Sequence, residues 1–82
     1  MPFSAEDRAL LLSVRGVGPT VIARLEQIGI EDLPALAGQD AGAVCIAASA
    51  VVGSTCWRNS PQAKAAVSGA IAAARTRLGA EA

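Results

Sequence analysis

The stretch LLLSVRGVGPTVIARLEQIGI, residues 10–30, carries the pattern that decides the fold. Apolar residues at helical spacing stand on both sides of a turn formed by Gly16, Val17 and Gly18. Pro19 follows at once, and proline suits the first position of a helix because the N–H that it lacks would have no intrahelical partner there. The stretch therefore predicts two helices, residues 5–13 and 19–28, joined by a short turn.

The rest of the chain predicts further helical segments. Pro34 limits residues 30–38 to a short helical connector. Asp40 is a good N-cap for a helix over residues 41–52, and Ser60 is one for a helix over residues 61–78. Because apolar residues lie on nearly every side of residues 41–52, we expect that helix to be the central and most buried one.

Length and composition indicate a compact, single all-α domain spanning residues 1–82. A chain of 82 residues forms one modest core. The hydrophobic fraction is 52% but the aromatic fraction only 2%, and alanine is abundant, which favours helices packed closely through small side chains. The side chains expected to face the core are Leu10, Leu11, Val14, Val21, Ile22, Leu25, Ile28, Leu33, Leu36, Ala63, Ala66, Val67, Ala70, Ile71, Ala74 and Leu78.

Charge and cysteine content narrow the function classes. Seven basic and seven acidic residues give zero formal net charge, so the strongly basic balance of many nucleic-acid-binding domains is absent. The two cysteines, Cys45 and Cys56, have no zinc-site spacing, there is no histidine, and we expect both to be buried thiols. No nucleophile and base are paired by spacing, so an enzyme is not expected. The N-terminus does not resemble a signal peptide and no apolar run could span a bilayer, which predicts a cytoplasmic protein.

The double glycine has a structural and a functional interpretation. Gly16 and Gly18 leave no side chain in front of the backbone amides, and the turn stands at a helix N-terminus, where free N–H groups favour an anion. The turn could thus present donors to a phosphate. The alternative is that the glycines only allow a tight connection between two helices.

Residues 10–30 resemble the helix-hairpin-helix motif of DNA-binding and repair proteins, which has apolar residues ahead of Gly-aliphatic-Gly and then a helix. Over nearly its full length the chain is similar to small bacterial helix-hairpin-helix proteins of the "pathogenicity locus" family. The resemblance implies a SAM-like fold of about five helices, with a first hairpin over residues 5–28 and a degenerate second helical pair over residues 41–78. It also implies sequence-independent DNA binding, accessory to repair or recombination.

The resemblance implies a set of site residues around the turn. The backbone amides around Gly16, Val17 and Gly18 would contact phosphate oxygens, and Thr20 would join them. Arg15 and Arg24 flank the turn, and their charges either add phosphate contacts or only form a solvated helix surface. A monovalent cation such as K⁺ or Na⁺ would lie on the backbone carbonyls of Leu12, Val14 and Val17. Second-hairpin contacts would come from Arg58 and Lys64 if residues 53–61, where a glycine again precedes a proline at a helix start, repeat the first turn and lie on the same surface.

The chain also departs from the motif. Thr20 stands where many active hairpins have lysine, Arg15 where proline is common, and Ile22 where alanine is usual. With one intact hairpin, the expected DNA affinity is weak. Trp57 is either a core or loop anchor or a group that stacks on a base or enters a partner's pocket.

Two functions therefore remain open. The first is a weak, sequence-independent DNA-binding module. The second is a protein-interaction or self-association module without DNA binding, which the neutral charge, the missing lysine at Thr20 and the apolar residues 41–52 favour. In the second case the partner is another protein or a second copy of the chain.

Overall fold

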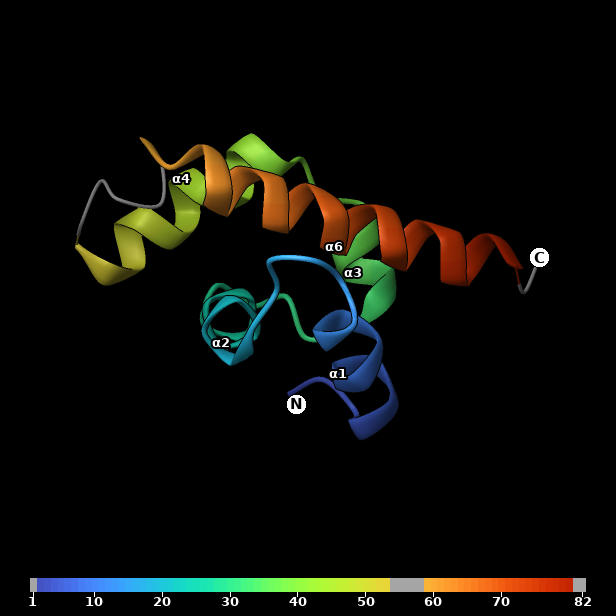
Figure 1. Ribbon diagram of the computed structural model, residues 1–82. Helices are drawn as coiled ribbons and strands as arrows, with labels where there is room; N and C mark the ends of the chain where they lie inside the picture. Colours follow the sequence, from blue (N-terminus) through green and yellow to red (C-terminus); the bar gives the residue numbers. More distant parts are fainter. Residues whose placement is uncertain (1, 54–58, 81–82) are drawn as a thin grey trace.

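The regular structure is entirely helical over the residues that the computed structural model describes, 2–53 and 59–80 (Figure 1). The helices are α1 (Ala5–Leu12), α2 (Pro19–Gln27), α3 (Leu33–Ala37), α4 (Ala41–Val52) and α6 (Pro61–Ala80). The all-α prediction is confirmed, and the observed ends lie within a few residues of the expected ones. The radius of gyration is 11.7 Å, which is that of a compact chain of this length.

Side-chain caps explain where most of these helices begin. An N-cap oxygen accepts a backbone N–H of the first turn and so satisfies one donor that has no intrahelical partner. In each of four helices a side-chain oxygen of the N-cap residue accepts the backbone N–H of the residue three positions later. The pairs, with the accepting side chain first, are Ser4 and Asp7 at α1, Asp32 and Ala35 at α3, Asp40 and Ala43 at α4, and Ser60 and Ala63 at α6. The predicted caps at Asp40 and Ser60 are therefore confirmed.

The central helix is α6, not α4 as the sequence suggested. Helix α6 has 20 residues, about 30 Å in length, and it runs across the molecule in contact with α1, α2, α3 and α4 (Figure 1). Helix α4 lies to one side and leaves Ile46 56% and Val51 50% exposed. Alanine occupies much of α4, and burying an alanine gains little free energy, so its apolar composition did not indicate full burial.

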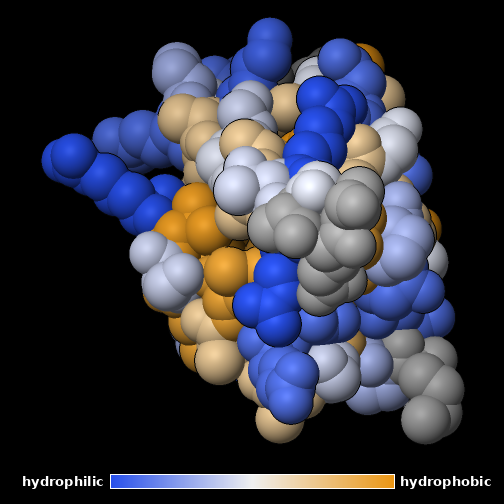
Figure 2. Space-filling view, turned by 90° about the vertical axis from the view of Figure 1, so that its right-hand side faces the viewer, coloured by the Kyte–Doolittle hydropathy of each residue, from blue (hydrophilic) through white to orange (hydrophobic). Residues whose placement is uncertain are grey.

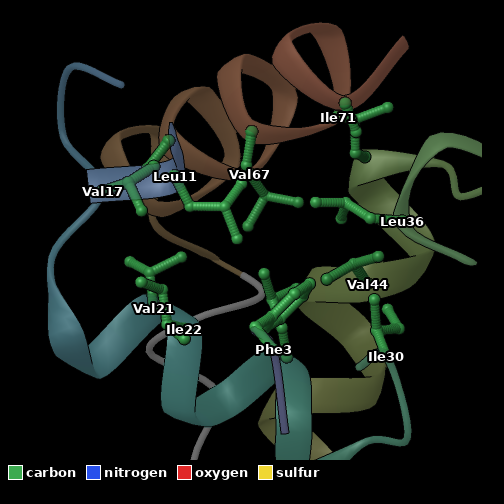
Figure 3. Packing of buried hydrophobic residues seen from close by; sticks show 14 of the residues in the cluster. Phe3, Leu11, Val17, Val21, Ile22, Ile30, Leu36, Val44, Val67 and Ile71 are labelled. Carbon is green, nitrogen blue, oxygen red and sulfur yellow. The ribbon is translucent and has the colours of Figure 1, made fainter. Parts of the chain in front are cut away.

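The core lies between α6 and the other helices. Figure 3 shows Leu11 of α1, Val67 of α6, Leu36 of α3 and Val44 of α4 pointing into one cluster. Leu11, Leu36 and Val67 are completely buried, as are Ile22 and Leu25 of α2. The predicted core is therefore confirmed for most of its members, while Leu10, Val14, Ile28 and Leu78 pack against it partly buried. Phe3, which was not among the expected core residues, also lies in the core and is 4% exposed.

The pair α1 and α2 is closed by a turn at one end and tied by an ion pair at the other. At the open end the Glu26 carboxylate accepts the Phe3 backbone N–H at 3.0 Å and Arg8 Nη2 at 3.2 Å. These contacts fix the N-terminal segment and α1 against the last turn of α2. The Gly16–Gly18 turn consequently lies at the opposite end of the pair from Glu26.

Candidate nucleic-acid interface

The turn between α1 and α2 is anchored by its valines and opened by its glycines. Val17 is buried and donates its N–H to the Val14 carbonyl at 3.0 Å, so it holds the turn against the core instead of facing solvent. Gly16 has φ +86°, a left-handed conformation that glycine adopts without strain. Gly18 is extended (φ −119°, ψ −176°) and is the N-cap residue of α2.

Amides in and beside the turn have no acceptor among the described residues. They include those of Gly16 and Thr20, which are exposed, and that of Gly18, which is half-buried. Gly18 has no side chain to cap α2, whereas α1, α3, α4 and α6 each have a side-chain cap. The N-terminus of α2 therefore offers donors and a positive helix dipole to an external acceptor.

The charge pattern around the turn is one-sided although the chain is neutral. The acidic residues are Glu6, Asp7, Glu26, Glu31, Asp32, Asp40 and Glu81, so residues 8–25 and 41–80 contain none. Arg15 is exposed beside Gly16 and has no ion pair or hydrogen bond with a described residue. The zero net charge does not reveal this separation of acidic and basic residues, but the positions of the acidic residues along the sequence do.

Arg24, expected beside the turn, lies elsewhere on α2. Its Nη1 donates to Gln27 Oε1 at 2.8 Å, toward the C-terminal end of the helix. Its Nε is buried and finds no acceptor in the described part of the chain. The structure therefore does not bring Arg24 together with Arg15 and the free amides.

Of the expected second-hairpin contacts, Lys64 does not join the turn either. Lys64 lies close enough to Cys45 of α4 for its charge to act on that thiol, which places it on the α4 side of α6. It is separated from Gln62, which faces the turn, by about 200° around the helix. Arg58, together with Cys56 and Trp57, lies outside the described residues.

The carbonyls expected to hold a monovalent cation differ in whether they accept a hydrogen bond from the protein. The Val14 carbonyl accepts the Val17 N–H, which leaves it one lone pair, while the Leu12 and Val17 carbonyls accept no hydrogen bond from a described residue. Neutral oxygens of this kind suit a hard monovalent cation. No group of three or more His, Cys, Asp or Glu side chains in the described residues is arranged to hold a metal.

Two hollows lie beside α6, and each is lined by one arginine. The two arginines differ in whether they donate hydrogen bonds to the protein. One hollow, of about 580 Å³, is lined by Val14, Arg15, Gly16, Gln62, Ala65, Ala66 and Gly69. The other, of about 450 Å³, contains Arg75, whose Nε and Nη2 donate to the carbonyls of Ala37 and Gln39. Arg75 thus stabilises the end of α3, whereas Arg15 remains available.

Among the side chains that the structure describes, large apolar ones are exposed at two places. Ile46 and Val51 lie on α4, which has no charged residue, and Leu12 is 44% exposed at the end of α1. Figure 2 views the molecule from the side where α6 ends and shows apolar side chains gathered in one area among hydrophilic ones. No described helix is long and apolar enough to cross a membrane.

Comparison with known proteins adds no relative: no protein family, no curated protein and no solved structure matches this chain.

Proposed function

We propose that this protein binds DNA weakly and without sequence preference, through the turn between α1 and α2. The observation that carries the proposal is the uncapped N-terminus of α2, where the amides of Gly16, Gly18 and Thr20 have no acceptor among the described residues. Backbone amides at a helix N-terminus bind phosphate oxygens. Such contacts position a duplex without reading its bases, so binding is independent of sequence.

The charge distribution supports the same surface. A polyanion approaching the turn meets Arg15 and no acidic residue between positions 8 and 25, while Glu26, Glu31 and Asp32 lie beyond the open end of the helix pair. With one arginine and a few neutral donors, the contact neutralises few phosphates. We therefore expect low affinity with a shallow dependence on salt concentration. If a cation binds, the Leu12, Val14 and Val17 carbonyls are the groups that would hold it, and its charge would add to the attraction for phosphate.

Gly18 gives the cleanest test of this proposal. A β-carbon on Gly18 would meet no heavy atom within 4 Å, and its φ is one that any residue adopts. Gly18→Ala therefore leaves the fold intact but places a methyl group beside the free amides. Gly16→Ala is a poorer probe because Gly16 has positive φ and a β-carbon there would lie 3.4 Å from Cβ of Ala66.

The experiment is a salt titration of duplex binding, followed by fluorescence anisotropy, for the wild type, Gly18→Ala and Arg15→Gln. Arg15→Gln should weaken binding and reduce the salt slope by about 1. Lys64→Gln is the matched control, because it removes one charge from the α4 side of α6 and should change binding little. If the wild type does not bind duplex DNA at low salt, or if Lys64→Gln and Arg15→Gln have equal effects, the proposal fails.

Self-association through α4 is a second candidate function. Ala43, Ile46, Ala50 and Val51 are exposed on a helix that has no charged residue, so two copies could pack there without charge repulsion. Ile46→Lys would place a charge on this face, and sedimentation equilibrium would then report a monomer where the wild type is a dimer. A wild-type chain that stays monomeric at high concentration contradicts this candidate.

A further inference from the structure

The hollow between the turn and α6 has an apolar floor and a polar rim. Val14, Ala65 and Ala66 contribute aliphatic side chains and Gly69 has none, while the exposed Arg15 and Gln62 contribute the polar groups. Its volume of about 580 Å³ is within the range of binding pockets, about 300–1,000 Å³. It opens next to the free amide of Gly16, which also lines it.

From this arrangement we infer that the hollow seats the sugar–phosphate backbone of the same DNA strand whose phosphate is held at the turn, with Gln62 as an additional binding residue. The inference rests on the proposed function and extends it. It assigns Gln62 and Ala65 in the first half of α6 to the interface, where the sequence pattern had placed only Lys64.

Charge complementarity identifies the occupant as a polyanion. Neither element that lines the hollow supplies an acidic residue, since the chain has none over residues 8–25 and 41–80. An acidic rim would repel a phosphodiester, and an apolar ligand would not need the arginine. The side chain of Gln62 is exposed and has no hydrogen bond with a described residue, so its amide is free to donate to a phosphate oxygen.

The floor suits the sugar that accompanies the phosphate. The exposed Ala65 lets a strand approach α6 closely, while Val14 and Gly16 of the turn pack over Gly69 and Ala66. The aliphatic surface of Ala65 and Val14 matches the C–H face of deoxyribose, and the lining offers no aromatic ring on which a base could stack. The hollow therefore accommodates the backbone of the strand and adds no base preference.

Two substitutions on α6 test the inference. Ala65→Leu partly occupies the hollow, and Gln62→Glu puts a negative charge at its rim; both positions are exposed, so the fold should persist. Ala72→Leu is the matched control, because Ala72 is an exposed alanine two turns further along α6 that lines the other hollow instead. Circular dichroism and thermal melting check that each variant is folded.

We expect Ala65→Leu and Gln62→Glu each to lower the affinity for a DNA duplex by about tenfold, and Ala72→Leu to leave it within about twofold. If Gly18→Ala and Arg15→Gln weaken binding while Ala65→Leu and Gln62→Glu do not, the hollow is not part of the interface and the proposed function stands without it. If Ala65→Leu and Ala72→Leu weaken binding equally, the inference also fails. If the wild type does not bind DNA, the proposed function fails and the inference fails with it.

Discussion

Gly69 of α6 and Val14 of the turn are in direct contact: a β-carbon on Gly69 would lie 2.9 Å from Cγ1 of Val14. One turn of α6 earlier, Ala66 touches the position that a β-carbon of Gly16 would occupy, at 3.4 Å. The turn therefore packs against α6 through residues with little or no side chain. This contact holds the exposed amides of the turn at a fixed place on the molecule.

Gly69→Ala should destabilise the protein relative to Gly79→Ala, the same change near the end of the same helix. The added methyl group forces Val14 to move, and a valine side chain cannot easily rotate away. At Gly79 a β-carbon meets nothing within 4 Å, so only the gain in helix propensity remains. Urea denaturation should place Gly69→Ala below Gly79→Ala by about 1–3 kcal/mol. Equal unfolding free energies would show that the turn does not pack on α6 as described.

The two glycines of the turn should respond differently to alanine. Gly16 has φ +86°, which costs an alanine about 1–2 kcal/mol, and the nearby Cβ of Ala66 adds to the cost. Gly18 has an ordinary backbone conformation and open space around it. We expect Gly16→Ala to lower the urea midpoint and Gly18→Ala to leave it unchanged or raise it slightly. A larger loss of stability for Gly18→Ala than for Gly16→Ala would contradict this description of the turn.

The sequence predicted the helices well because their boundaries are local. Asp40 and Gly53 enclose α4, and Ser60 with Pro61 starts α6, through caps and backbone preferences that depend on few neighbours. The buried stripe that includes Val67 and Ile71 likewise follows from helical spacing. Element type and most of the core were therefore accessible from the sequence.

The arrangement of the helices and part of the site were not accessible. The apolar composition of α4 suggested a central helix, but tertiary packing gave that place to α6 and left Ile46 exposed. Arg24 follows the turn closely in sequence, yet its guanidinium donates to Gln27 at the other end of α2. The hollow that joins Gln62 to Arg15 depends on a contact between segments about 50 residues apart, which no local pattern encodes.

Glu26→Ala should destabilise the protein more than Arg8→Ala. The Glu26 carboxylate accepts two hydrogen bonds, from the Phe3 backbone and from Arg8, so its loss leaves the half-buried Phe3 N–H without an acceptor. We expect a cost of about 1–2 kcal/mol for Glu26→Ala. The side chain of Arg8 is 41% exposed, and an ion pair of that kind contributes about 0.2–1 kcal/mol. Guanidinium denaturation of both variants and of the double variant measures the loss of unfolding free energy in each. Equal losses for Glu26→Ala and Arg8→Ala would mean that the hydrogen bond from Phe3 to Glu26 does not stabilise the protein.

Cys45 should make the stability depend on pH in the alkaline range. Burial raises the pKa of its thiol above the usual 9.0, and the charge of Lys64 only partly offsets this. Above about pH 9 the thiol of the unfolded chain loses its proton while that of the folded chain keeps it. The stability that the neutral thiol contributes is therefore complete below pH 9 and is lost as pH rises toward the pKa of the folded state.

The unfolding free energy of the wild type should fall relative to Cys45→Ala between pH 8 and pH 10.5, by no more than about 1.4 kcal/mol per pH unit. Urea denaturation of both proteins across this range measures the difference; a difference that stays constant would show that Cys45 is not desolvated in the folded protein.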